Sequence, residues 1–260
     1  MPTRFASSLL LLATVTLASC ATPPASDGGY QRFMQLAGDL QKRGDSNSAA
    51  ALYEKATQQP EAQIEAWLKL GETRLASGDA RGAERAYQQA LELKTDSADA
   101  LLGLGTAQLR QGKLERAVSA LTQAAALSGQ ADAFNRLGIA QILLGHADAA
   151  QTAFGKSLAL APNDLDTRCN LALAYALGDQ SQLALDNIRA VSESPRAQPR
   201  HQRNELLITV LAGREKDVQS MRLEDIPASE RKKLVTEARR IKAIKDPIVQ
   251  ARELGLVDTH

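Results

Sequence analysis

Aromatic residues are scarce in this chain of 260 residues, where Phe, Trp and Tyr together make up 3% of the sequence. Ala and Leu supply most of the apolar residues, and Glu, Gln, Lys and Arg are abundant beside them. These residue types have high intrinsic helix propensity. The composition therefore predicts an all-α protein.

An excess of charge of one sign is also missing, since the formal net charge is +1. A surface that binds nucleic acid normally carries a large positive excess, so we expect no nucleic-acid partner. The chain has 2 cysteines, too few for a disulfide framework. The fold must therefore rest on the packing of its side chains.

Patterns typical of catalysis or metal binding are absent from the sequence. None of the 3 histidines belongs to a His-Glu-x-x-His or paired-cysteine pattern. The dipeptide Gly112-Lys113 resembles the end of a phosphate loop, but Ala107 and Leu114 stand where Gly and Ser or Thr are needed. We therefore predict no enzymatic activity, no cofactor, no metal and no small-molecule substrate.

The strongly hydrophobic run of the chain extends from Phe5 to Leu17. As a helix it would rise about 20 Å, short of the roughly 30 Å of a hydrocarbon layer. Arg4 precedes this hydrophobic run, and the two together indicate a signal peptide over residues 1–19. The sequence Leu-Ala-Ser-Cys that ends this region resembles a bacterial lipobox, which implies cleavage before Cys20 and lipid on its sulfur. The alternative is an ordinary secretory peptide that leaves a free thiol.

Ala21 follows the lipobox cysteine, where an Asp would be read as a different sorting signal. By resemblance to the usual bacterial sorting rule, this implies an outer-membrane protein, lipid-anchored at the periplasmic face. Residues 20–29 are small, polar and rich in Pro and Gly, as in a flexible tether. Such a segment reaches about 30 Å at most, so we expect the domain to work close to the bilayer.

A motif recurs with a period of about 34 residues. The clearest copies are Trp67, Leu70, Gly71, Gly78, Ala83, Tyr87 and Ala90; Leu101, Leu104, Gly105, Gly112, Ala117, Leu121 and Ala124; and Phe134, Leu137, Gly138, Gly145, Ala150, Phe154 and Ser157. This pattern resembles the tetratricopeptide repeat, which implies a superhelical solenoid of stacked helical hairpins. Because Gly71 lacks a side chain, we expect Tyr87 to pack closely against it.

Weaker copies of the motif flank these three, one around Phe33 and one around Asn170, and a degenerate copy extends from about Pro199 to Met221. We therefore predict a solenoid of five to six hairpins over residues 30–223. One hairpin cannot bury its apolar faces alone, so neighbouring copies must stack.

The chain beyond the repeats predicts a capping helix within residues 224–247 and a tail over residues 248–260. An end repeat needs a cover with a polar outer face. Residues 196–245 hold thirteen Lys and Arg against seven Asp and Glu, whereas residues 39–99 hold eight against eleven. A solvated cap is our main interpretation, and contact of the basic helix with a protein or with anionic lipid stays open.

In stacked hairpins the first helices line the concave face, and a strip of Leu, Ile, Asn and Thr there suits an extended or helical peptide. We interpret Asp and Glu at the second repeat position as helix N-terminal charges. A Lys and Arg set that would clamp a C-terminal carboxylate, as in some chaperone-binding relatives, is missing. The predicted groove residues are Leu68, Glu72, Leu102, Thr106, Arg110, Asn135, Ile139, Ile142, Cys169 and Leu173.

Two late segments, CNLALAYALGDQSQLAL at residues 169–185 and RNELLITVLAGREKDV at residues 203–218, resemble TadD-type lipoproteins of the tight-adherence, or Flp pilus, assembly system. The resemblance implies a scaffold or pilotin-like chaperone in pilus assembly and secretion, with the secretin or other assembly components as partners. The alternative is a tetratricopeptide adaptor for outer-membrane protein insertion or for peptidoglycan enzymes.

Overall fold

The computed structural model describes residues 28–221, 223 and 226–254. The predicted signal peptide and Cys20 lie outside the described residues. The helices are α1 Gly28–Lys42, α2 Ser46–Thr57, α3 Ile64–Ala76, α4 Ala80–Leu93, α5 Ala98–Arg110, α6 Leu114–Ser128, α7 Ala131–Leu143, α8 Ala147–Leu160, α9 Leu165–Leu177, α10 Ser181–Ser192, α11 Pro199–Leu211, the 3-10 helix η1 Glu215–Ser220, α12 Ala228–Lys242 and α13 Pro247–Glu253.

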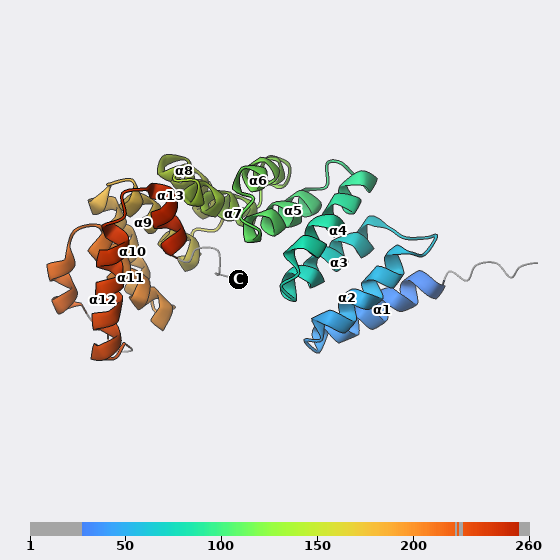
Figure 1. The fold of residues 1–260 in the computed structure, drawn as a ribbon, viewed down its shortest axis with the longest axis horizontal. Helices are drawn as coiled ribbons and strands as arrows, with labels where there is room; N and C mark the ends of the chain where they lie inside the picture. Colours follow the sequence, from blue (N-terminus) through green and yellow to red (C-terminus); the bar gives the residue numbers. More distant parts are fainter. Residues whose placement is uncertain (1–27, 222, 224–225, 255–260) are drawn as a thin grey trace, which may run out of the picture.

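Consecutive helices pair into antiparallel hairpins that stack in chain order from α1 and α2 to α9 and α10, and the stack curves so that the first helices share one side (Figure 1). Within the described residues all regular structure is helical. The prediction of an all-α solenoid of helical hairpins is confirmed. Each hairpin packs against its neighbours, so the core is a continuous row of small clusters between helices.

Local signals set the ends of these helices. Asp79 accepts a hydrogen bond from the backbone N–H of Gly82 at 2.8 Å and so caps the start of α4. Gly112, in the turn between α5 and α6, has φ +70°, a conformation that glycine adopts without steric cost. In the fifth hairpin Asp179 takes this role with φ +58°, a conformation that Asp tolerates better than most residues.

The glycine of the repeat motif allows the two helices of a hairpin to come close together. A Cβ atom added at Gly71 would lie 2.7 Å from Cζ of Tyr87, and one at Gly138 would lie 2.5 Å from Cε1 of Phe154. Neither contact is possible for a side chain without rearrangement. The predicted close packing of Tyr87 on Gly71 is therefore confirmed, and the motif repeats it at Phe154.

The C-terminal end of the solenoid closes differently from the other hairpins. Helix α11 is followed by the short η1, and α12 packs against α11 where a full second helix would be expected. Ala238 and Ile241 of α12 are 0% and 3% exposed, which provides the apolar face of a cap. The sixth hairpin is thus incomplete because residues 212–220 contain too few apolar residues for an amphipathic helix.

The predicted tail begins with a helix. Residues 247–253 form α13, capped by Asp246, whose carboxylate accepts hydrogen bonds from the backbone N–H groups of Ile248 and Val249. Helix α13 folds back onto α7 (Figure 1). A Cβ atom added at Gly145 would lie 3.1 Å from Cβ of Pro247. A chain segment far downstream therefore covers part of the fourth hairpin.

Candidate protein-binding groove

A cavity of about 590 Å³ opens on the concave side of α3, α5 and the first half of α7. We call this region the open half of the groove. Five of the predicted groove residues line it: Leu68, Glu72, Leu102, Thr106 and Arg110. Leu75, Tyr87 and Gly103 complete its floor and walls, and acidic residues at the helix starts form its rim.

Several charges of the open half are already paired within the protein. Lys69 Nζ lies 2.9 Å from a carboxylate oxygen of Glu72, and Arg136 Nε lies 3.0 Å from Asp132. Arg110 donates a hydrogen bond of 2.6 Å to the backbone carbonyl of Leu75, which joins α5 to α3. These contacts preorganise the groove walls, and such half-exposed pairs contribute little to stability by themselves.

Tyr87 is a groove residue that was not among the predicted ones. It belongs to the second helix α4, but its ring inserts between Gly71 on α3 and Gly103 on α5, where an added Cβ would lie 2.2 Å from Cζ. The residue is 5% exposed, and burial, with the nearby carboxylate of Glu72, raises the pKa of Tyr87. Its hydroxyl therefore keeps its proton. In other hairpins the repeat position of Gly103 carries Lys69, Arg136 or Asn170. The absence of a side chain at Gly103 was the sequence signal from which the placement of Tyr87 could have been predicted.

Four predicted groove residues do not face an open groove: Ile139, Ile142, Cys169 and Leu173. All are 8% exposed or less and belong to one core cluster together with Ile208, Leu211, Ile241 and Ala251, from α11, α12 and α13. The prediction of open groove positions is wrong for these four, since their side chains lie in the core, where α13 contacts α7 and α11 contacts α9. We call this region the closed half of the groove.

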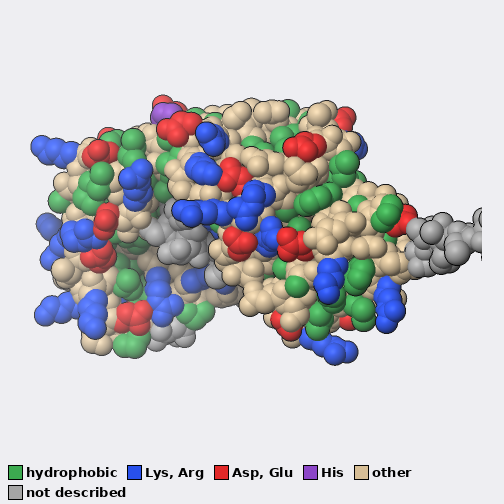
Figure 2. Space-filling view, turned by 45° about the vertical axis from the view of Figure 1, so that its right-hand side comes forward, with side chains coloured by type: hydrophobic (Ala, Val, Ile, Leu, Met, Phe, Trp, Pro, Cys, Tyr) green, Lys and Arg blue, Asp and Glu red, His purple; other side chains and the backbone are tan. Residues whose placement is uncertain are grey.

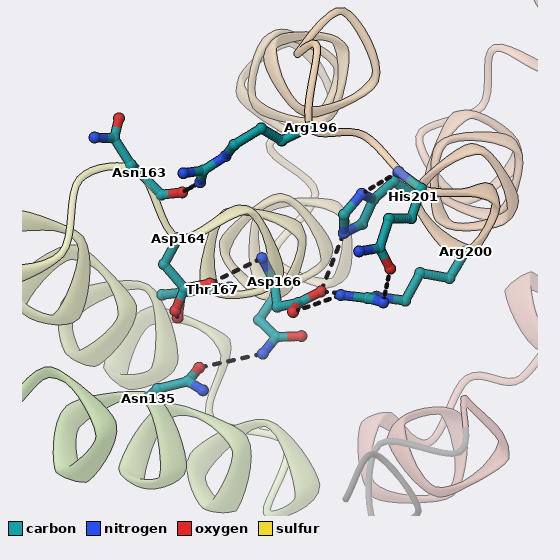
Figure 3. Close-up of polar contacts among 10 residues, drawn as sticks. Asn135, Asn163, Asp164, Asp166, Thr167, Arg196, Arg200 and His201 are labelled. Carbon is teal, nitrogen blue, oxygen red and sulfur yellow. Dashed lines mark hydrogen bonds and ion pairs between the residues drawn. The ribbon is translucent and has the colours of Figure 1, made fainter.

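Asn135, the remaining predicted groove residue, lies at the border between the halves. Its side-chain oxygen accepts a hydrogen bond of 3.2 Å from the amide of Asn170 (Figure 3), which links α7 to α9. Cys169, which precedes Asn170 in the chain, is 4% exposed, and burial raises the pKa of this thiol to about 12. This environment is that of a small, unreactive packing residue.

Asp166, at the second position of its repeat, is bound by two residues of the next first helix (Figure 3). Arg200 donates hydrogen bonds of 3.1 and 2.9 Å to its two oxygens, and His201 Nε2 lies 3.1 Å from one of them. Because His201 Nδ1 accepts from the backbone N–H of Gln198 at 2.9 Å, we assign the ring proton to Nε2. Burial alone would raise the pKa of Asp166, but the bonds from Arg200 and His201 outweigh it and lower that pKa.

The molecular surface carries charges of both signs. On the face shown in Figure 2, Lys and Arg side chains alternate with Asp and Glu, and hydrophobic side chains lie between them. No group of three or more His, Cys, Asp and Glu that could hold a metal ion occurs among the described residues. No helix within that part of the chain is long and apolar enough to cross a membrane.

Comparisons with known proteins agree with the repeat architecture. Residues 33–144 match the family model of the cilia and flagella-associated protein 70 middle TPR-like domain, and residues 131–164 match that of the tetratricopeptide repeat. The chain is a tetratricopeptide-repeat protein. A fold of this kind is typical of scaffolds that bind other proteins. A search of the curated proteins finds no match.

Solved structures of tetratricopeptide-repeat proteins superpose on this one. The structure of MamA has 25% sequence identity and a TM-score of 0.57, and the match covers 66% of this chain and 98% of MamA. PilF of Pseudomonas aeruginosa has 16% identity and a TM-score of 0.61, with 88% of this chain and 97% of PilF covered. YrrB, described as having an unusual peptide-binding site, has 20% identity and a TM-score of 0.53, with 71% and 90% covered. The last two show a shared fold.

Proposed function

We propose that this protein is a periplasmic scaffold, or pilotin-like chaperone, of a Flp pilus assembly and secretion system. A lipid on Cys20 would hold it at the outer membrane, and the open half of the groove would bind segments of the secretin or of other assembly components. The observation that carries the binding role is the cavity lined by Leu68, Leu75 and Leu102, where half-buried apolar side chains stand beside charged ones.

Support for the finer assignment comes from the sequence. The lipobox and the short tether predict attachment close to the membrane, and the late repeats resemble TadD-type lipoproteins. The fold shared with PilF covers 88% of this chain, so the two proteins have solenoids of similar length. The stacked hairpins of the described residues present the open half as a preformed surface on which a flexible segment can be ordered.

In-cell photocrosslinking tests the binding role and the partner together. A photoreactive residue replacing Glu72, exposed in the open half, should capture the secretin or another pilus-assembly component. The same residue at Leu127, which is 53% exposed on the second helix α6, is the matched control and should not. Equal capture from both sites would contradict binding in the groove. Capture of β-barrel insertion components or peptidoglycan enzymes, without a pilus component, would contradict the pilus role.

Membrane attachment is tested separately with Cys20→Ser. This variant should lose incorporation of radiolabelled fatty acid and move from the outer-membrane fraction to the soluble periplasmic fraction. Retention of the label, or of the membrane location, would contradict anchoring through Cys20.

A further inference from the structure

Helix α13 departs from the packing order of the described stack. Each first helix contacts the first helix of the next hairpin, since α3 contacts α5, α5 contacts α7, α7 contacts α9 and α9 contacts α11. Helix α12 then packs on α11 and covers the end of the solenoid. Helix α13 instead returns to α7, far upstream in the chain (Figure 1). It is therefore an addition to a stack that α12 already caps.

The apolar contact between α13 and the solenoid is small. Ala251 is 0% exposed in the core cluster of the closed half, and Leu254 packs partly against that cluster. The branched apolar residues of the helix, Ile248 and Val249, are 36% and 42% exposed. The helix has 7 residues, and helices shorter than about 12 residues are marginal by themselves in water. Few buried contacts hold α13 in place, so its release can leave the hairpins folded.

Two polar contacts join α13 to α12, the helix before it. Gln250 Nε2 donates a hydrogen bond of 3.1 Å to the backbone carbonyl of Ile241. Glu253 forms an ion pair with Arg240, and both side chains are about half-exposed. Such exposed pairs contribute little to stability. Because these contacts are made with α12, the position of α13 on α7 rests on its apolar face, and a charge at Ala251 should break that contact selectively.

The open half of the groove stops on the helix that α13 contacts. Its cavity reaches α7 at Asp132 and Arg136. Ile139 and Ile142 follow on the same helix, and both belong to the core cluster that includes the buried residue of α13. Leu75, the counterpart of Ile142 in its own repeat, lines the cavity, whereas Ile142 is 1% exposed. The apolar strip of the groove therefore continues along α7 into the region where α13 docks.

We propose that α13 is a strap that limits the groove in the free protein. A partner segment with apolar side chains, bound first in the open half beside Leu102, displaces α13 and continues onto Ile139 and Ile142. The apparent affinity for the partner is reduced by the fraction of molecules in which the strap is released, so docking of α13 sets a threshold for binding. This inference rests on the proposed function, because it describes how the same groove is regulated.

Alkylation of an introduced thiol in the full-length protein tests release of the strap. Ile139→Cys places the thiol at a position that is 8% exposed. Adding Ala251→Glu should speed its reaction with iodoacetamide at least tenfold, because a carboxylate cannot stay in the apolar cluster. Val249→Glu puts the same charge on the exposed side of α13 and is the matched control, with no change in rate. Cys169 is the internal reference and should stay slow, since α11 contacts α9.

Three results would overturn the proposal: an unchanged rate at position 139, equal acceleration by Ala251→Glu and Val249→Glu, or equal acceleration at Cys169. The last would show that the closed half unfolds as a whole. Leu254→Glu, which charges the other packed residue of the segment, is the second variant and should act in the same direction as Ala251→Glu with a smaller effect.

In-cell crosslinking from Glu72 connects the strap to partner binding. At limiting partner levels Ala251→Glu should raise capture at least threefold, and Val249→Glu should leave it unchanged. Equal capture from the original chain and both variants would show that the strap does not regulate the groove, while the scaffold role stands. If Glu72 captures no protein in any of the three chains, both the scaffold role and its regulation by α13 are wrong, whatever the alkylation rates.

Discussion

Leu102 and Cys169 occupy the same position of their repeats, two hairpins apart, and have different surroundings. Leu102 lines the cavity of the open half, whereas Cys169 is 4% exposed within a cluster that includes residues of α11, α12 and α13. The repeat motif directs both side chains to the concave face. What packs over that face decides whether a position binds a partner or supports the core.

The accessibility of Cys169 gives the largest expected difference between the halves. Burial raises the pKa of Cys169 to about 12, so little thiolate forms at pH 8; the greater nucleophilicity of a more basic thiolate offsets part of this loss, and alkylation should be roughly a hundredfold slower than for an ordinary cysteine. Mass spectrometry of the iodoacetamide-modified peptide measures the rate. The matched variant Leu102→Cys places a thiol in the open half and should react at least a hundredfold faster. Similar rates at both positions would show that the closed half is open in solution.

Stability should also differ between equivalent positions. Ile142 in the closed half is 1% exposed, so Ile142→Ala should lower the free energy of unfolding by about 2–5 kcal/mol. Leu75 has the same repeat position in the open half and is half-buried. Leu75→Ala should cost about 1 kcal/mol, because fewer contacts are lost. Urea denaturation measures both, and equal losses would contradict the division of the groove into two halves.

The smallest expected effect concerns the carboxylate that α11 binds. The pKa of Asp166 is lowered in the folded protein, so its charge stabilises the fold above the unfolded pKa of about 3.9. That contribution is lost as the pH falls through the lower folded pKa. Since the side chain is 57% exposed, we expect less than about 1 kcal/mol.

Asp166→Asn tests this directly. The variant should be less stable than the original protein at pH 6, and the difference should shrink as the pH is lowered from 5 towards 3. Asp99→Asn removes a carboxylate without an ion pair at the same repeat position and should show a smaller difference at pH 6, from the loss of a helix N-terminal charge alone. A constant difference for Asp166→Asn across this range would contradict a role for its ionised form.

The sequence predicted the parts of the groove that depend on the repeat alone. The spacing of Gly71 and Tyr87 predicted their close packing, because an added Cβ would overlap the ring. The same register placed Leu68, Leu102 and Arg110 on the concave face, where they line the cavity. These outcomes follow from contacts within one hairpin or between adjacent hairpins, so a motif of about 34 residues contains enough information to specify them.

Residues of the closed half could not be predicted in this way. Ile139, Ile142, Cys169 and Leu173 have the periodicity of groove residues, but they share one core cluster with residues of α11, α12 and α13. The decisive contacts, such as Pro247 against Gly145, join segments far apart in the chain and outside the repeat. A local pattern does not report such contacts, because helix α13 has 7 residues, too few to show a helical period.

The sequence by itself determined the helical hairpins, their order and the face on which the groove lies, since these follow from helix propensity and from a motif repeated at fixed spacing. The tertiary structure alone decided which half of the groove stays open, which carboxylates find cations within the chain, and that Tyr87 of a second helix lines the cavity. The physical reason is that accessibility and pairing are set by contacts between helices that no single repeat contains.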